Sequence, residues 1–414
     1  MRILFISRRY FPAISGMSVY AQNLLRELVH LGHEATMISQ FRGDEAGTRV
    51  YGGGPPPPLE GVEIIGLEAL GEQEPGFACW ERDIEVMVEA GLREHEQKPF
   101  DIVHAQYGYP TGLAALEFSR RTGVPNVVSI QGGDGHWVGP CCETHRLAMR
   151  AVLDHAGALL IGSRSFASEV EENHGVSPAV FSVVPGAVNC ERFRPREDWH
   201  AGELRNPDEP VFLYHGRVDR RKGALDTLDA LQLLHERGRR FRLLVSGIGP
   251  DFEAVKQKIE ELNAGDWAQM LGYVQYEEVP QVYKRGDIFL SPTYAEGFSN
   301  TILEAMASGL TCVSCLAVGV IDCLRDSENA LLVQPGDILA LAGAIERVLD
   351  DTELRARITQ KAFEEANSLY AWPTIARQIE GVYKRLVGTQ PDLNFPKEFP
   401  VDPSCRFREA PHLL

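Results

Sequence analysis

Short apolar runs of strand length alternate with helical stretches along most of the 414-residue chain, and this alternation restricts the fold more than any other feature. Residues 3–7 predict a buried strand, residues 19–31 predict an amphipathic helix that ends at Gly32, and residues 34–38 predict the next strand. A helix that connects two short buried strands indicates parallel pairing in a doubly wound sheet. The predicted fold class is therefore α/β.

The pattern starts again in the middle of the chain, after a polar segment over residues 194–210 that has no periodicity and carries three prolines. We therefore expect two Rossmann-like domains, residues 1–193 and 194–371, with a helix at about 372–388 packing back on the first and an irregular tail over 389–414. Sheets of this kind bind ligands at the carboxyl ends of their strands, so we expect the site in a cleft where the two domains face each other. The remaining predicted strands are 62–65, 101–105, 127–130, 159–162 and 181–184 in the first domain, and 211–215, 242–246, 268–271, 288–291, 311–314 and 330–333 in the second.

Charge and hydropathy limit the partners. The formal net charge of −17 argues against nucleic acid and anionic membranes, because both require a basic face. No apolar run approaches the ~20 residues that span a bilayer, and the apolar start of the chain is too short for a signal peptide. We expect a cytoplasmic protein.

The eight cysteines are too few for a disulfide scaffold in a chain of this length. Cys312 and Cys315 lie in an apolar run that predicts a buried strand, and no second Cys or His pair has metal-ligand spacing with them. We expect reduced core thiols there and a structural role for the adjacent Cys141 and Cys142. Neither a metal ion nor a cofactor is expected.

A cationic turn follows the first strand of the second domain. The segment YHGRVDRRKG at 214–223 places Arg217, Arg220, Arg221 and Lys222 against one aspartate, at the carboxyl end of a strand. Guanidinium and ammonium groups that converge on one point suit a diphosphate. The alternative is a solvated basic turn.

A second candidate lies in the segment YAEGFSNTILEAMASG at 294–309, which carries two carboxylates eight positions apart, Glu296 and Glu304. Ser299 can cap a helix that begins at Asn300, and the free N–H groups of a helix start favour an anion. Glu304 lies in the second turn of that helix and can accept hydrogen bonds from sugar hydroxyls, unless it is a solvated helix residue. With the cationic turn, the segment predicts a nucleotide-sugar pocket.

Gly247 and Gly249 follow a predicted strand in the segment LLVSGIGPDFE. Phe252 stands where a dinucleotide fingerprint requires its third glycine, so the segment is weak as a nicotinamide site. It remains suitable as a tight turn whose backbone approaches a nucleotide.

With these motifs the chain resembles the retaining glycosyltransferases of family 4, which have the two-domain GT-B fold, over residues 1 to about 388. The matching segments are HGRVDRRKG, SGIGP, AEGFSNTILEAMASG and LLVQPGD. The resemblance implies that Arg217 and Lys222 hold the donor diphosphate, that Glu304 binds the ribose, and that Glu296 contacts the donor sugar. Arg217, Lys222 and Glu296 are then the expected catalytic residues, and the donor-binding residues are Gly16, Gly216, Gly247, Gly249, Gly297, Phe298, Ser299, Asn300, Thr301 and Glu304.

The first domain, which carries the acceptor in this family, departs more from the family pattern. Ser15 precedes Gly16 where the family has a pair of glycines, and Gln131 stands where the family often has a histidine. Glutamine can hydrogen-bond a sugar hydroxyl but cannot shuttle a proton near neutral pH. The resemblance places Gln131, Gly132 and Asp134 on the acceptor and sugar side.

The activity implied by the resemblance is transfer of a sugar from a UDP- or GDP-linked donor to an acceptor hydroxyl, with retention of configuration, in glycan, glycolipid or small-molecule glycoside biosynthesis. No D-x-D triplet occurs in the chain, so Arg217, Lys222 and the helix start are expected to stabilise the leaving diphosphate in place of a metal. Two alternatives stay open. The departures at Ser15, Gln131 and Gly186, where the family's linker motif has asparagine, leave room for a catalytically silent nucleotide-sugar-binding subunit. A nucleotide-sugar epimerase on the same fold would need proton-moving carboxylates or histidines in the first domain.

Overall fold

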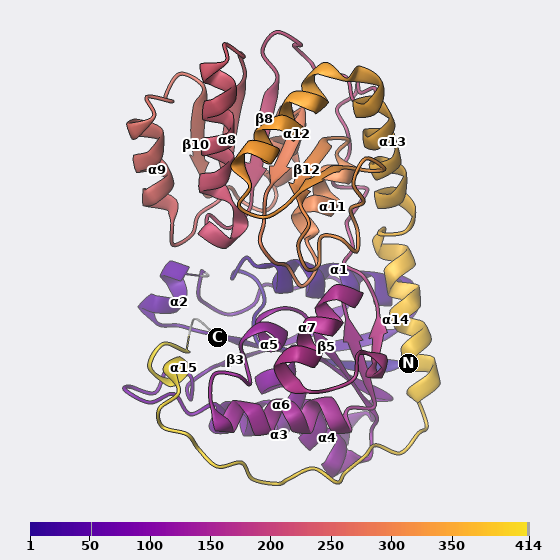
Figure 1. Ribbon diagram of the computed structural model, residues 1–414. Coiled ribbons are helices and arrows are strands. Elements are labelled where there is room, and N and C mark those ends of the chain that lie inside the picture. Colours follow the sequence, from indigo (N-terminus) through magenta and orange to yellow (C-terminus); the bar gives the residue numbers. More distant parts are fainter. Residues whose placement is uncertain (51, 412–414) are drawn as a thin grey trace. The chain divides into compact units, whose positions relative to one another are not determined.

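The computed structural model describes residues 1–50 and 52–411, and the chain divides into two compact units. Unit 1 comprises Met1–Pro185 and Ile375–Leu414, and unit 2 comprises Gly186–Thr374. Within each unit, helices pack on a central sheet (Figure 1). No helix in the described part of the chain is both long enough and apolar enough to cross a bilayer.

The sheet of unit 1 has the strand order β3-β2-β1-β4-β5-β6-β7, and all its pairings are parallel. Its inner strand β1 has Ile3, Leu4, Phe5 and Ile6 fully buried, because both faces of the sheet are covered. The strands are β1 (Arg2–Ser7), β2 (Glu34–Phe41), β3 (Val62–Glu68), β4 (Ile102–Gln106), β5 (Asn126–Ile130), β6 (Ala158–Ile161) and β7 (Phe181–Val183).

Helices cover both faces of this sheet. Figure 1 shows α1 (Gly16–His30) above the sheet, and α3 (Trp80–Gln97), α4 (Leu113–Thr122) and α6 (Glu143–His155) below it. The helix α14 (Trp372–Leu386) also packs on unit 1. Its Glu380 lies 2.9 Å from Nε2 of His33, in the turn after α1, and its Tyr383 hydroxyl lies 2.5 Å from Nδ1 of His104 on β4. The shorter elements are α2 (Glu45–Val50), η1 (Gly108–Gly112), α5 (Gly133–His136), α7 (Arg164–His174), η2 (Pro178–Val180) and α15 (Arg406–Glu409).

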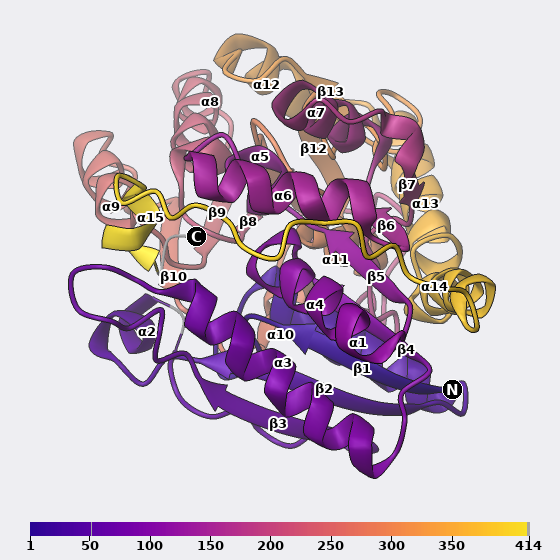
Figure 2. The same ribbon diagram turned by 90° about the horizontal axis from the view of Figure 1, so that it is seen from below.

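The C-terminal tail follows α6 from one end to the other (Figure 2). Asp392 lies 2.9 Å from His155 Nδ1 at the end of that helix, and Asp402 N donates to Thr144 Oγ1 at its start. The tail is irregular up to residue 405 and then forms the one-turn helix α15, whose Phe407 and Arg408 are buried. The tail that was expected to be irregular over residues 389–414 therefore contains one short helix.

Unit 2 also has a parallel sheet, in the order β10-β9-β8-β11-β12-β13. Alternate residues of β8 point to opposite faces, so Phe212 and Tyr214 enter one core cluster and Leu213 enters the other. The strands are β8 (Val211–His215), β9 (Arg242–Ser246), β10 (Ala268–Gly272), β11 (Ile288–Ser291), β12 (Thr311–Cys315) and β13 (Leu331–Val333).

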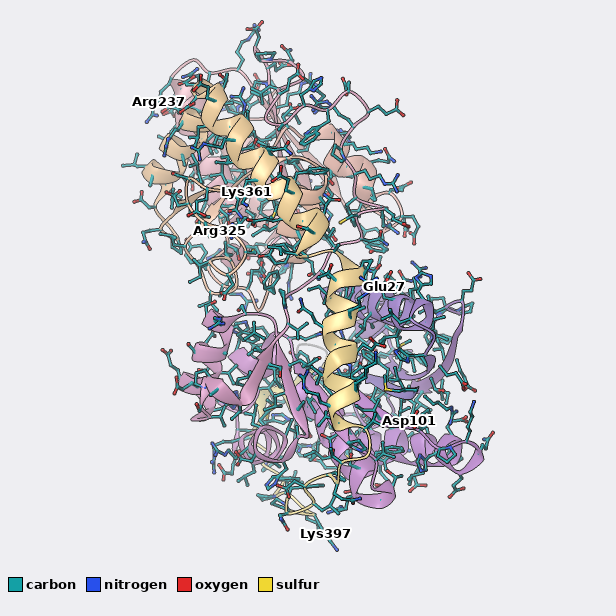
Figure 3. The ribbon with its side chains drawn as sticks, turned by 90° about the vertical axis from the view of Figure 1, so that its right-hand side faces the viewer. Glu27, Asp101, Arg237, Arg325, Lys361 and Lys397 are labelled. Carbon is teal, nitrogen blue, oxygen red and sulfur yellow. The ribbon has the colours of Figure 1, made fainter. Side chains whose placement is uncertain are left out.

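The first of these clusters packs under α8 (Ala224–Glu236), α9 (Phe252–Glu261) and α12 (Ile338–Asp350), and the second packs under α10 (Val279–Arg285), α11 (Asn300–Ala307) and α13 (Thr352–Ser368). Buried Glu365 of α13 ties this second layer to the loop after β12. It pairs with Arg325, accepts a hydrogen bond from Asn329 Nδ2 at 2.9 Å and lies 3.5 Å from Lys361 Nζ. Figure 3 shows Arg325 and Lys361 near this point.

The observed sheets confirm the α/β fold class with two doubly wound sheets, and each predicted strand is present with its ends no more than three residues from those expected. The first unit ends at Pro185 and not at residue 193, because Phe193 packs against Tyr283 in the core of unit 2. The chain returns to unit 1 at Ile375, within α14.

Candidate active site

The cationic turn after β8 is shaped by its own carboxylates. Asp219 accepts from Arg221 Nη2 at 2.9 Å and lies 3.6 Å from Arg217 Nε, and Arg220 Nε lies 3.3 Å from Asp251. Hydrogen bonding from Arg221 holds the pKa of Asp219 below its ordinary value, so this carboxylate stays ionised. Three of the four predicted cations therefore meet two aspartates, and Arg220 and Arg221 are already paired with them.

Lys222 ends the short helix η3 (Arg220–Lys222) and points to the loop after β11. Its Nζ lies 2.6 Å from Glu296 Oε2 and donates to Ala295 O at 3.3 Å. Gly223 makes this approach possible, since its φ of 73° is left-handed and a Cβ there would lie 2.2 Å from Pro292 O. Two of the expected catalytic residues, Lys222 and Glu296, thus form an ion pair in unit 2.

The two glycines of the SGIGP turn serve the packing of neighbouring loops. A Cβ on Gly247 would lie 1.8 Å from Gly216 O, and one on Gly249 would lie 2.2 Å from Val218 O. Gly216 and Gly247 donate backbone N–H bonds to Ser246 O and Gly272 O, at 3.0 and 2.8 Å. The loops after β8, β9 and β10 therefore stack backbone on backbone at the carboxyl edge of the sheet, and Arg217 stands on the first of them.

Helix α11 begins at Asn300, as predicted, with Ser299 at the N-cap position. The Ser299 hydroxyl does not cap the helix; it lies 3.2 Å from Thr301 Oγ1 instead. Gly186 lies directly against this start, because a Cβ there would fall 2.6 Å from the Phe298 ring and 2.8 Å from Asn300 Oδ1. The departure from the family asparagine at Gly186 thus has a steric reason in this chain.

Glu304 is buried, with 7% of its surface exposed, and is not a solvated helix carboxylate. Its Oε2 accepts from the Tyr283 hydroxyl of α10 at 2.9 Å, and the same hydroxyl contacts Thr301 O at 3.1 Å. Burial raises the pKa of Glu304 to about 7, although the Tyr283 hydrogen bond opposes that rise. The carboxylate is held by one donor and is costly to ionise, which suits a group that gains further donors from a ligand.

Three polar side chains connect the strand ends β1, β4 and β5 in unit 1. Gln106 Oε1 accepts from Ser7 Oγ at 2.8 Å, and Gln106 Nε2 donates to Gln131 Oε1 at 2.8 Å and to Met17 O at 3.0 Å. Gln131 Oε1 is thereby occupied, which leaves its amide nitrogen as the donor for a ligand. Gly16, the first residue of α1, is exposed beside Met17, and Ser15 Oγ caps this helix by accepting from Ser18 N.

Asp134 is fully buried, and backbone amides surround its carboxylate. It accepts from Gly108 N at 2.8 Å, Gly132 N at 2.8 Å and Gln131 N at 3.0 Å. Burial raises its pKa to about 6 against the effect of these bonds. Asp134 therefore fixes the loop that presents Gln131 and Gly132.

His104 and His136 have structural partners. The imidazole of His104 is fully buried between the Tyr383 hydroxyl and Ser129 Oγ, at 2.5 and 2.7 Å, and burial lowers its pKa to about 3. His136 Nδ1 lies 2.5 Å from Glu169.

Sequence reasoning missed Tyr283, Asp251 and the pairing of Lys222 with Glu296. Tyr283 and Glu304 are 21 residues apart on different helices, and no local pattern joins them. Asp251 follows the SGIGP turn directly, but its partner Arg220 lies 31 positions earlier in the chain. Only the fold brings these residues together.

Two glycosyltransferase family models match the chain, one in each unit. Residues 195–365 match the family described as glycosyl transferases group 1, and residues 15–187 match the glycosyl transferase 4-like domain. A D-inositol 3-phosphate glycosyltransferase from Catenulispora acidiphila is 27% identical over 405 residues, with 90% of each chain covered.

Solved structures share the fold. Sucrose-phosphate synthase from Thermosynechococcus elongatus superposes with a TM-score of 0.75 at 22% identity, covering 93% of this chain and 98% of that one. Anabaena HepE in complex with UDP and glucose gives a TM-score of 0.71 at 16% identity, covering 93% of this chain and all of the other.

Two doubly wound units with these loops at their strand ends define a glycosyltransferase of the GT-B type. The chain belongs to the GT-B glycosyltransferases of family 4.

Proposed function

We propose that this glycosyltransferase takes its sugar from a nucleoside diphosphate donor, UDP- or GDP-linked, and transfers it to an acceptor hydroxyl with retention of configuration. The observation that carries the proposal is the meeting of two turns in unit 2. There Lys222 Nζ lies 2.6 Å from Glu296 Oε2, in the loop that leads into the helix of buried Glu304. Lys222 can bind a phosphate, and the carboxylates of Glu296 and Glu304 can accept hydrogen bonds from the hydroxyl groups of a sugar on either side of that phosphate.

The ion pair suggests how the donor engages. Before binding, Glu296 neutralises Lys222, which keeps both side chains positioned without a ligand. A diphosphate that approaches Lys222 and Arg217 takes over as the anionic partner, and Glu296 is then free to accept bonds from sugar hydroxyls. Glu304 accepts from the ribose beside its existing bond from Tyr283.

The transfer step needs no enzyme nucleophile. The bond from the anomeric carbon to the phosphate oxygen breaks, the acceptor oxygen bonds to the same face of that carbon, and the acceptor proton moves to the leaving phosphate oxygen. Arg217, Lys222 and the N–H groups at the start of α11 stabilise the charge on the departing diphosphate, an effect typically worth about 3 kcal/mol for each well-placed donor. We propose that no metal ion takes part in this step. Gln131 donates to the sugar or acceptor through its amide nitrogen, and Asp134 positions it.

A donor panel with product analysis tests the proposal. The purified chain is incubated with UDP- and GDP-sugars and a set of sugar and lipid-linked acceptors, and the anomeric configuration of the product is read by proton NMR. We expect an α-linked product from an α-linked donor. An inverted product would refute retention. Binding of every donor without turnover would indicate a silent subunit, and an epimerised free donor would indicate an epimerase.

A further inference from the structure

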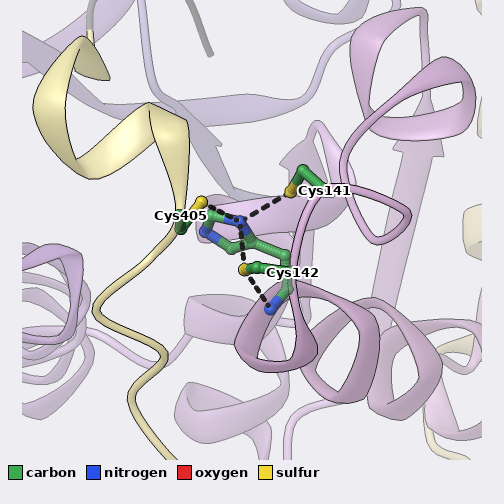
Figure 4. A group of neighbouring side chains, drawn as sticks. Cys141, Cys142 and Cys405 are labelled. Atoms are coloured by element: carbon green, nitrogen blue, oxygen red, sulfur yellow. Dashed lines mark hydrogen bonds between the residues drawn. The ribbon is translucent and has the colours of Figure 1, made fainter.

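Three thiols and one imidazole of unit 1 meet at a single point, and none of the four residues belongs to the proposed transfer site. Nδ1 of His145 lies 3.0 Å from Cys141 Sγ, 3.2 Å from Cys142 Sγ and 3.5 Å from Cys405 Sγ (Figure 4). The four ligand atoms all lie within 4.8 Å of one another. Cys141 and Cys142 precede α6, His145 lies in its first turn, and Cys405 comes from the tail, 260 positions from His145.

This set of atoms has the composition and spacing of a tetrahedral metal site. Thiolate and imidazole are the ligands of structural Zn²⁺, with bonds of about 2.3 Å to sulfur and 2.0 Å to nitrogen. Those bond lengths place nitrogen and sulfur ligands about 3.6 Å apart in a tetrahedron. The observed separations of 3.0–3.5 Å need only small outward movements to admit the ion.

The surroundings hold the imidazole in place, while Cys141 and Cys142 are partly exposed. His145 is fully buried, and its ring packs against Tyr109, Trp80 and Phe407 at centroid distances of 4.6, 5.0 and 6.4 Å. An apolar shell of this kind fixes a ligand ring and limits access of solvent to the metal. Buried Arg408 adds a positive charge nearby on α15, which suits a site whose three thiolates outweigh the charge of one divalent ion.

The position of Cys405 gives such a site a mechanical role. The residues after it bind unit 1 at several points: Arg408 donates to Ala78 O at 2.6 Å and to Glu81, and Pro411 O accepts from Arg8 Nη2 at 2.7 Å. Arg8 directly follows β1 and begins the loop that leads to Gly16. A metal bond at Cys405 would therefore hold the tail against the loop between β1 and Gly16.

We propose that Cys141, Cys142, His145 and Cys405 bind one Zn²⁺, which clamps the C-terminal tail to unit 1. On binding, the three thiols release their protons to solvent and the neutral imidazole coordinates through Nδ1. The cluster lies outside the transfer site, so this metal is structural and distinct from the metal-free diphosphate site proposed above.

The test measures metal content and geometry in the full-length chain. Purified wild-type protein should contain one zinc per chain by plasma mass spectrometry. Replacement with Co²⁺ should give thiolate charge-transfer bands and the intense visible bands of a tetrahedral site. Cys405→Ser and Cys141→Ser should each weaken zinc binding by more than about 100-fold against a chromophoric chelator, because the loss of outer-shell partners alone costs 10–100-fold.

Cys190→Ser is the matched control. Cys190 is half-buried like Cys141, lies in unit 2, and its Sγ donates to Ala366 O, a role that a serine hydroxyl can take over. This variant should keep the full zinc content.

The rate of trypsin cleavage after Lys397, an exposed tail residue labelled in Figure 3, measures how firmly the tail is held against unit 1. Chelation should accelerate cleavage at Lys397 in the wild type and leave Cys405→Ser, already cut rapidly, unchanged. Two results would overturn the proposal: wild-type protein that binds neither zinc nor cobalt, or an intact mass two hydrogens lower that reveals a disulfide within the cluster.

Discussion

Glu304 shows how one side chain can be tuned by its surroundings before any ligand binds. It lies in a helix whose neighbouring residues Ile302, Leu303, Ala305 and Met306 are fully buried, and the Tyr283 hydroxyl donates a hydrogen bond to it. Burial raises its pKa to about 7, so near neutral pH it carries a proton part of the time. The negative charge of Glu304, which the proposed ribose contact requires, therefore depends on pH.

Replacement of Glu304 by glutamine should weaken nucleoside diphosphate binding by roughly 1.5–3 kcal/mol, the range for a hydrogen bond to a charged group. In the wild type the affinity should also rise from pH 6 to pH 8, as the carboxyl group ionises, and this rise should be smaller in the variant. Calorimetry at both pH values measures the two effects. A 2′-deoxyribose nucleotide should lose less affinity on mutation than the normal one. Equal affinity of wild type and Glu304→Gln would refute the ribose assignment.

The same carboxyl group should make stability depend on pH. Its pKa is higher in the folded protein than in the unfolded chain, so between about pH 4.5 and pH 7 the folded state binds more protons. Its contribution is complete below that window and is lost as pH rises through it. Glu304→Gln should therefore gain stability relative to wild type on going from pH 4.5 to pH 7, by up to about 3 kcal/mol at 1.36 kcal/mol per pKa unit. Urea denaturation at the two pH values tests this, and a constant difference would contradict the assigned pKa.

Lys222 and Arg220 stand in the same turn and should behave differently. Lys222→Ala removes the cation beside Glu296 and should reduce turnover by orders of magnitude and weaken nucleoside diphosphate binding, because a partly desolvated anion loses its partner. Arg220→Ala removes a mostly exposed side chain that pairs with Asp251 and should change affinity little. Steady-state kinetics and calorimetry on both variants make the comparison. A similar loss in both would mean that the whole turn acts as a diffuse basic patch.

At the scale of elements, the loops after β8, β9 and β10 form a stack that depends on glycine. Gly247 has a φ of 127°, and any Cβ there would collide with Gly216 O. Gly265, in contrast, has open space around the position of a Cβ and no left-handed backbone. The stack supports the carboxyl edge of the sheet from which Arg217 extends.

Gly247→Ala should therefore destabilise unit 2 by about 3 kcal/mol, from the clash and the left-handed backbone together. Gly265→Ala should change stability by less than about 0.5 kcal/mol, as is usual for surface substitutions. Thermal unfolding of the two variants beside the wild type provides the measurement. If Gly247→Ala unfolds at the wild-type temperature, the loops are not packed as described.

The elements themselves were largely predictable from sequence. Buried parallel strands such as β1 and β11 contain continuous apolar runs, and Ser299 at the start of α11 is a local signal for the helix start. What escaped prediction depends on distance along the chain. Tyr283 contacts Glu304 from another helix, and Cys405 contacts His145 although the two residues are 260 positions apart in the chain. The predicted capping hydrogen bond of Ser299 is absent, because its hydroxyl contacts Thr301 Oγ1 instead.

At the scale of the whole molecule, we expect the proposed nucleotide site and the proposed zinc site to respond differently to added metal ions. The diphosphate is assigned to side-chain cations and a helix start in unit 2, whereas the thiol cluster belongs to unit 1. Nucleoside diphosphate affinity should therefore be the same in EDTA and in millimolar Mg²⁺ or Mn²⁺. Calorimetry under the three conditions tests this expectation, and affinity that appears only with the added metal would show that the diphosphate site has been misread.

The order of the two units along the chain has a consequence for biosynthesis. Unit 2 is an insertion within unit 1, and its two ends are joined, since Val188 N donates to Tyr370 O at 2.8 Å and Trp372 N donates to Val188 O at 3.3 Å. Ribosomes release the first 185 residues early, yet His104 gains its Tyr383 partner, and α6 its covering tail, only after unit 2 has emerged. Domains usually fold in the order of their synthesis. Here the unit that begins first is completed last, because its seven strands all precede unit 2 while α14 and the tail follow it. A nascent chain therefore carries a full sheet without α14 and the tail for the whole time that unit 2 is being translated.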